Sequence, residues 1–184
     1  MIKRWLLKTF YKKELSEIHK YYQGIVEEIR RSTNKKTNMI EIVHSVLQEK
    51  NHVIIGEAIN KMNEQLLVVQ WVFGDEIWLK LYSERYNVCN RHPRIMATYV
   101  APYGKCPYIK IDDILVEDNE VGNGSILMTH FIEYCRKTDA KYICGELSSE
   151  DNDHFDRLEH FYKKHGFDVE FNNNRSSGSI KYTI

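Results

Sequence analysis

The stretch that most constrains the fold of this chain runs from Tyr108 to Thr138. Apolar residues alternate with polar ones at its start, which is typical of a half-buried β-strand. An acidic turn follows, then Gly122-Asn123-Gly124, and then apolar residues at helical spacing. A strand, a glycine turn and a helix aim free backbone N–H groups and the positive end of the helix at one point. The stretch therefore predicts a site for phosphate at the start of that helix.

The glycine turn by itself fits more than one interpretation. Gly122 and Gly124 could serve only to let the chain turn with positive φ, with no ligand at all. A P-loop requires Lys and then Ser or Thr after its last glycine, and no Lys follows Gly124. The dinucleotide-binding fingerprint requires a third glycine at the position that Leu127 occupies. These two kinds of phosphate loop are therefore excluded.

What remains resembles the phosphate loop of the GCN5-related N-acetyltransferase (GNAT) superfamily, Gln/Arg-x-x-Gly-x-Gly/Ala. The matching stretch is 119–124, in which Asn119 stands where the family has Gln or Arg. A second family motif, Phe-Tyr-x-Lys-x-Gly-Phe, is similar to the sequence at 160–167. One strand and one helix are predicted between the two motifs, as in the family. The chain is identified on these two motifs as a member of that superfamily.

The resemblance implies an α/β fold of mixed α+β type. Its centre is a twisted, mostly antiparallel sheet with one splayed parallel strand pair, flanked by helices. Residue patterns independently predict a helix, a short helix, several antiparallel strands and then β-α-β-α-β-β. An added helix stands where the family has its usual first strand. The predicted strands cover 53–55, 66–73, 76–82, 95–100, 109–116, 142–147, 167–171 and 180–184, and the two later helices cover 126–134 and 154–165.

The N-terminal part of the chain is predicted to form one long helix over 2–31. Seven apolar residues recur along it in steps of three or four: Leu7, Tyr11, Leu15, Ile18, Tyr22, Ile25 and Ile29. The polar run at 32–38 predicts a break, and a short helix follows it over 39–50. We therefore expect an amphipathic basic helix at 1–36 and a GNAT-like acetyltransferase domain at 37–184. The apolar stripe is expected to pack on its own domain or on a second copy, which would give a homodimer.

The net charge of zero conceals an asymmetry along the chain. Residues 1–36 hold ten Lys or Arg against four Glu, a net charge of +6. Residues 112–159 hold thirteen Asp or Glu against four Lys or Arg, a net charge of −9. The acidic part, which carries the loop motif, disfavours nucleic acid as a partner and favours a cationic acceptor such as an amine.

Composition argues against several other classes of protein. No run of 18 apolar residues is present, so no membrane span is expected. The first residues resemble the start of a signal peptide, but Lys8, Lys12 and Lys13 interrupt any apolar segment. The four cysteines (89, 106, 135 and 144) show no C-x-x-C spacing, so neither zinc nor a redox dithiol is indicated. A cytoplasmic protein with reduced thiols is expected.

The resemblance implies acetyl-CoA as the acyl donor and direct transfer of the acetyl group to a primary amine. In the family, backbone N–H groups of the loop hold the pyrophosphate, and N–H groups of the preceding strand polarise the thioester oxygen. The latter correspond to Leu115 and Val116 in this chain. The expected donor-binding residues are Leu115, Val116, Asn119, Val121, Gly122, Asn123, Gly124 and Ser125.

Two candidate catalytic residues are expected for this reaction, and only the first is implied by the resemblance. Tyr162 matches the family's tyrosine near the coenzyme sulfur and is expected to act as general acid, although it could instead only anchor its helix. Glu146 is the first choice for the base, which would require desolvation of its carboxylate. The alternatives to Glu146 are Glu117, Asp112, Asp113 and a chain of water molecules. The histidines at 154, 160 and 165 lack the spacing of a metal site, so no metal is expected.

Two other functions remain open on the sequence. One is a non-catalytic acyl-CoA-binding regulatory protein, which the altered Asn119 favours. The other is an adaptor whose basic N-terminal helix binds nucleic acid or a membrane surface. The identity of the acceptor is not encoded in a recognisable motif. The aromatic segment from Tyr82 to Tyr103, with Tyr86 and Tyr99, is a candidate lining of the acceptor pocket on its position alone.

Overall fold

The computed structural model describes residues 2–86, 92–118 and 120–184, without the side chains of 2–15, 35, 151 and 152. The chain divides into two compact units, Met1–Glu41 and Ile42–Ile184. Helix α1 (Ile2–Gln48) provides the first unit, and its residues from Ile42 onward belong to the second. Among the described residues, no helix combines the length and the apolar character that a membrane crossing requires.

Helix α1 contains the predicted helix over 2–31, but the predicted break at 32–38 is wrong because the helix continues through that run. The hydroxyl of Thr33 donates to the carbonyl of Ile29 at 2.9 Å, and that of Thr37 donates to the carbonyl of Thr33 at 3.1 Å. These polar side chains bond back to the preceding turn, so they do not compete with the helical backbone. The short helix predicted over 39–50 is therefore the end of α1.

The apolar stripe of α1 differs in burial along the helix. Ile18, Tyr22 and Ile29 are each more than half exposed in the first unit. Ile42 and Val46, in the last turns, are buried within the second unit. The last turns of α1 therefore contribute to the core of the second unit.

Eight strands form one sheet in the second unit, and the predicted strands are all present. The first five strands follow one another as antiparallel neighbours, and the sheet order is β1-β2-β3-β4-β5-β6-β8-β7. The tight turn at Gly74 joins β2 to β3, and Gly74 has φ 58°. The strands are β1 (His52–Ile59), β2 (Gln65–Phe73), β3 (Glu76–Tyr82), β4 (Arg94–Val100), β5 (Tyr108–Leu115), β6 (Tyr142–Leu147), β7 (Asp168–Phe171) and β8 (Gly178–Thr183).

Strands β5 and β6 are the only parallel neighbours among the described strands, which confirms the predicted parallel pair. Their pairing runs from Tyr108 beside Tyr142 to Ile111 beside Gly145. Beyond Ile111, β5 continues to its end without pairing to β6. The two strands therefore splay apart toward their C-terminal ends, as the resemblance implied.

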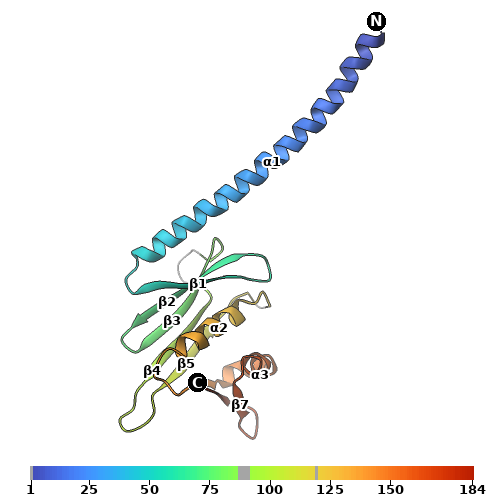
Figure 1. Cartoon of the computed structure of the whole chain (residues 1–184). Coiled ribbons are helices and arrows are strands. Elements are labelled where there is room, and N and C mark those ends of the chain that lie inside the picture. The colour runs from blue at the N-terminus through green and yellow to red at the C-terminus, as the bar shows by residue number, and fades with distance from the viewer. Residues whose placement is uncertain (1, 87–91, 119) are drawn as a thin grey trace. The chain divides into compact units, whose positions relative to one another are not determined.

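The largest cluster of buried residues in the second unit includes strand residues of the sheet and residues of helix α2 (Asn123–Cys135), which packs on β3 and β4 (Figure 1). Alternate residues of β3, such as Leu79 and Leu81, are fully buried, as expected for a strand with one face on the core. Leu127 and Phe131 of α2 are also fully buried. A 3₁₀-helix (Ser149–His154) and α3 (Phe155–Lys164) follow β6, so both later helices were predicted correctly.

Candidate active site

Among the described residues, the N-terminus of α2 presents backbone donors that have no partner, as the glycine turn predicted. Gly122 is the N-cap, with φ 93° in the left-handed region that glycine adopts most easily. The first helical hydrogen bond is donated by the N–H of Ile126 to the carbonyl of Gly122 at 3.1 Å. The N–H groups of Asn123, Gly124 and Ser125 are therefore not used inside the helix and point out of its positive end.

A cavity of about 430 Å³ lies at this helix end. Gly122, Gly124 and Ser125 line one side of it. Ile114 and Val116, at the splayed end of β5, line a second side. The remaining wall comes mainly from α3, through Arg157, Leu158, His160, Phe161, Tyr162 and Lys164. The fold thus brings the two sequence motifs together around one cavity.

Gly124 of α2 faces Phe161 of α3 at the cavity. A Cβ atom on Gly124 would lie 3.4 Å from Cε2 of Phe161 and 3.8 Å from Cγ2 of Val116. A methyl group would just fit there, whereas a longer side chain would enter the cavity or displace the ring. The missing side chain keeps the backbone N–H groups accessible from the cavity.

Basic side chains lie near the helix end, although Asp118 and Glu120 also line the cavity. Nζ of Lys164 lies 3.2 Å from Oγ of Ser125. Lys61, in the turn between β1 and β2, lines the cavity and donates its backbone N–H to the carbonyl of Val121 at 3.0 Å. Burial and the neighbouring Lys164 lower the pKa of His165, whose Nε2 lies 3.3 Å from the same Oγ. The cavity therefore combines helix-end donors with lysine side chains, which suits an anion.

Tyr162 lines the cavity from α3, although only 6% of its surface is exposed. Its ring packs edge-on against Phe161, with centroids 5.3 Å apart, and against Phe167 at 5.5 Å. Aromatic neighbours fix the ring in one orientation. The structure thus places the predicted general acid and the predicted phosphate loop on the same cavity.

The end of β5 carries an irregularity beside the cavity. Met96 of β4 is opposite Asp113, whereas the next residue, Ala97, is opposite Ile111. Asp112 is therefore the extra residue of a β-bulge, which bends the strand and changes the direction of the groups that follow. Val116 lines the cavity, and Leu115, the last residue of β5, precedes it.

The predicted base is not among the residues that line this cavity. The side chain of Glu146 is 79% exposed, and Oε1 lies 3.3 Å from Nζ of Lys110. Asp112 accepts a hydrogen bond from Thr98 at 2.7 Å and is exposed. Asp113 and Glu117 are exposed as well, so none of the four candidate carboxylates is desolvated. Asn119 lies outside the described residues.

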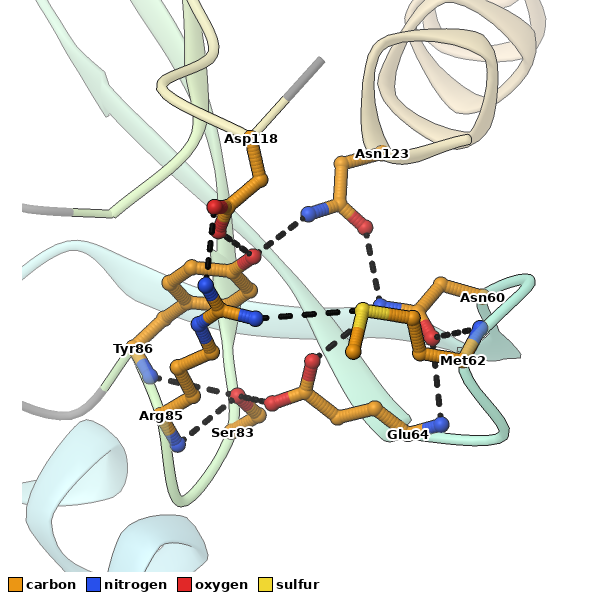
Figure 2. Close-up of polar contacts among 8 residues, drawn as sticks. All are labelled: Asn60, Met62, Glu64, Ser83, Arg85, Tyr86, Asp118 and Asn123. Carbon is orange, nitrogen blue, oxygen red and sulfur yellow. Dashed lines mark hydrogen bonds and ion pairs between the residues drawn. The ribbon is translucent and has the colours of Figure 1, made fainter. Parts of the chain in front are cut away.

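Tyr86 and Tyr99, the predicted lining of an acceptor pocket, are not among the residues that line this cavity. Tyr99 donates to Oδ1 of Asp139 at 2.7 Å. Tyr86 is buried behind the cavity, and its hydroxyl contacts Asp118 and Asn123, which both line it (Figure 2). The sequence analysis also missed Asn60, Glu64 and Ser83, which continue this set of hydrogen bonds.

Solved structures share this arrangement of strands and helices. The GNAT domain of PAT from S. lividans superposes with a TM-score of 0.53, covering 70% of this chain and 96% of that domain, at 8% sequence identity. The chain has the GNAT fold. A probable acetyltransferase from Staphylococcus epidermidis ATCC 12228 shows a looser likeness, with a TM-score of 0.47, 14% identity and coverage of 59% of this chain and 68% of that protein. The assignment of the GNAT fold depends on the first comparison.

Comparisons by sequence find fewer similarities than the comparison of structures. No protein-family model matches the sequence. Uncharacterized protein YocC of Bacillus subtilis (strain 168) is 40% identical over 83 residues, which are 45% of this chain and 49% of YocC. The match thus spans about half the length of this curated relative.

Proposed function

We propose that this protein is an N-acetyltransferase that moves the acetyl group of acetyl-CoA directly to a primary amine. One observation carries the proposal: Tyr162 and the N-terminus of α2 line the same cavity. The GNAT fold and the two sequence motifs support it. Fold alone does not define chemistry, so the proposal depends on the residues of the cavity.

Three features of the cavity fit the pyrophosphate of acetyl-CoA. The N–H groups of Asn123, Gly124 and Ser125 have no partner within the part of the chain that the structure describes, and they can bind an anion. The absence of a side chain on Gly124 leaves room for close approach to that backbone. Lys61 and Lys164 supply positive charge at the cavity wall. We assign these residues to donor binding, together with Val121 and Gly122 of the turn.

Acetyl-CoA supplies a thioester whose carbonyl carbon forms a C–N bond to the amine while its C–S bond breaks. We assign backbone N–H groups around Leu115 and Val116 to the thioester oxygen, where negative charge develops. Their place at the splayed end of β5 supports this assignment. We assign Tyr162 as the general acid that gives its phenolic proton to the departing sulfur.

The proton that leaves the amine needs a separate acceptor. Glu146 stays a prediction for this role, and its exposed side chain beside Lys110 does not supply the desolvation that a carboxylate base requires. Water is the alternative acceptor. The acidic character of residues 112–159 supports a cationic amine as the substrate that approaches this region.

We also propose that α1 joins two copies of the chain. Ile18, Tyr22 and Ile29 recur at heptad-like spacing and are each more than half exposed. An isolated helix with such a stripe gains most of its stability from a partner surface. Sedimentation of the full chain and of residues 37–184 would compare their masses in solution, and a monomeric full chain would contradict this proposal.

Turnover of amines tests the proposed reaction. The protein would be incubated with acetyl-CoA and a panel of polyamines, amino sugars and lysine-containing peptides, and thiol release would be followed. Tyr162→Phe should lower kcat by about 100-fold or more while the KM for acetyl-CoA changes little. Tyr99→Phe is the matched control, because its hydroxyl contacts Asp139 instead. Binding of acetyl-CoA without transfer to any amine would favour a non-catalytic acyl-CoA-binding protein.

A further inference from the structure

A closed ring of hydrogen bonds connects three segments that are far apart in the sequence (Figure 2). The segments are the turn between β1 and β2, the chain just after β3, and the start of α2. Asn60 is 4% exposed, and Ser83 and Asn123 are fully buried. Buried polar side chains of this kind lower stability unless each finds a hydrogen-bond partner.

The first half of the ring fixes the turn between β1 and β2. Nδ2 of Asn60 donates to Oε2 of Glu64 at 3.1 Å and to Oδ1 of Asn123 at 3.2 Å. Oδ1 of Asn60 accepts from the backbone N–H groups of Met62 and Glu64. Both ends of the Asn60 amide are therefore occupied, which fixes the turn that carries Lys61 to the cavity.

The second half of the ring holds the segment after β3. Oγ of Ser83 donates to Oε1 of Glu64 at 2.5 Å and accepts from the backbone N–H groups of Arg85 and Tyr86. Tyr86 closes the ring because its hydroxyl accepts from Nδ2 of Asn123 at 2.9 Å. Each group in the ring has a defined role as donor or acceptor, so the ring specifies one arrangement.

The hydroxyl of Tyr86 contacts both sides of the glycine turn. It donates to Oδ2 of Asp118 at 2.5 Å, before the turn, and accepts from Asn123, after the turn. Arg85 reinforces the first contact, with 2.8 Å between its guanidinium and Oδ1 of Asp118. Burial, followed by the hydrogen bond to Asp118, raises the pKa of Tyr86 to about 12. The phenol therefore keeps its proton at neutral pH, as donation to Asp118 requires.

We propose that Tyr86 and Asn123 are positioning residues of the donor site. This inference depends on the proposed function, because the site they position is the one assigned to the pyrophosphate. Tyr86 and Asn60 hold both polar atoms of the Asn123 side-chain amide. These contacts orient Asn123, whose backbone N–H is the first donor of the anion site. The Asn123 side chain is fully buried and bonded within the ring, so we assign its effect on the site to the backbone that it orients. Without the Tyr86 hydroxyl, the fully buried amide of Asn123 and the carboxylate of Asp118 lose the partner that they share. The start of α2 must then shift.

Tyr86→Phe removes this hydroxyl and little else. Titration calorimetry should show that it weakens acetyl-CoA binding about tenfold, and inorganic pyrophosphate binding by a similar factor. Asn123→Ala should do the same, and the double variant should lose less binding free energy than the sum of the two single losses, because the contact between Tyr86 and Asn123 is common to both changes. Tyr99→Phe is the matched control, since it removes a hydroxyl that contacts a carboxylate outside the cavity.

General destabilisation is distinguished from positioning by a second control. Ile77→Val removes a methyl group from a residue that is 2% exposed on β3, and it should lower the unfolding temperature without weakening either ligand. Hydrogen exchange of the ligand-free proteins adds a readout that needs no ligand. Tyr86→Phe should speed exchange in the peptide that spans the glycine turn and the first turn of α2, and Ile77→Val should not do so selectively.

The outcomes separate the inference from the proposed function. Unchanged exchange and unchanged affinity in Tyr86→Phe would overturn the positioning role while leaving the donor site intact. Absence of acetyl-CoA binding in the wild type would overturn the proposed function, and the exchange data would then decide whether Tyr86 orders the turn. Faster exchange with unchanged affinity would show a purely structural ring and would also overturn the inference.

Discussion

Gly124 on α2 lies so close to Phe161 on α3 that a Cβ atom on the glycine would stand 3.4 Å from Cε2 of the ring. The two residues belong to different motifs, and they meet at the wall of one cavity. The aromatic ring of Phe161 and the backbone at Gly124 leave space for a ligand only while residue 124 has almost no side chain. Substitutions at the two glycines of the turn should therefore have different effects.

Gly122→Ala and Gly124→Ala should separate backbone strain from cavity space. Gly122 has φ 93°, so alanine should cost about 1–2 kcal/mol of stability there, equivalent to a fall of about 2–8 °C in the unfolding temperature. Gly124 has no positive φ, and its methyl group would meet Phe161 at ordinary contact distance. Its alanine variant should stay within about 0.5 kcal/mol of the wild type. Thermal unfolding checks both, and equal losses would contradict the assignment.

Lys164 should contribute charge to anion binding. Lys164→Gln should weaken acetyl-CoA binding about threefold to tenfold, because a charge-assisted contact is lost from the cavity wall. The dependence of affinity on salt should also decrease in this variant. Lys181→Gln, on β8 and not among the residues that line this cavity, serves as the control. Identical calorimetric affinities for the Lys164 variant and the wild type would exclude a role for this lysine.

The last turns of α1 should be required for the stability of the second unit. Ile42 is 3% exposed and Ile40 is 68% exposed on the same helix. Ile42→Ala should therefore cost about 2–5 kcal/mol, whereas Ile40→Ala should change stability by less than about 0.5 kcal/mol. Urea unfolding of the two variants measures the difference. Similar small losses in both would mean that α1 ends outside the core.

The protein should lose stability in mild acid. Burial lowers the pKa of His92, so the folded state keeps this ring neutral at a pH where the unfolded chain binds a proton. The free energy of unfolding should therefore fall as the pH drops below about 6.5 and continue to fall down to the lowered pKa of the folded state.

A variant tests whether His92 causes this loss. His92→Phe keeps an aromatic ring beside Tyr82, whose centroid lies 4.0 Å away, and removes the titrating group. Urea unfolding between neutral pH and about pH 5 should show a weaker pH dependence in the variant than in the wild type. Burial also lowers the pKa of His165, so part of the dependence should remain. A steeper dependence in the variant would contradict this account.

Features encoded in short stretches of sequence were predictable. The strand ending at Leu115, the glycine turn and helix α2 each have a local pattern of apolar residues or glycine. The parallel pair of β5 and β6 followed from a strand, a helix and a second strand in succession. Gly166, with φ 84°, follows the end of α3, where the helix predicted over 154–165 also ends.

The predicted break in α1 failed because polarity alone does not end a helix. Ser, Thr and Asn favour turns when their side chains bond to non-helical backbone. In α1 the hydroxyls of Thr33 and Thr37 bond to carbonyls four residues earlier, within the helix. No glycine or proline interrupts residues 32–38, and that absence was the better signal.

The ring around Tyr86 was not predictable, because its contacts join residues with no local relationship. Asn60 and Asn123 are 63 positions apart, and Tyr86 and Asn123 are 37 apart. The sequence also could not show whether Glu146, the predicted base, faces the cavity. The alternation of β6 buries Ile143, Gly145 and Leu147 and shows that Glu146 points to the other face, but not which face carries the cavity.

Calorimetric titration with acetyl-CoA tests the donor site most directly. Wild type, Gly124→Glu and Gly24→Glu would be compared after thermal unfolding confirms that all three are folded. Gly24 is the matched control because a Cβ there meets nothing within 4 Å and the charge change is the same. We expect wild type and Gly24→Glu to bind with equal affinity and Gly124→Glu not to bind, because its carboxylate would occupy the anion site. Failure of the wild type to bind, or equal binding by all three proteins, would contradict the proposed donor site.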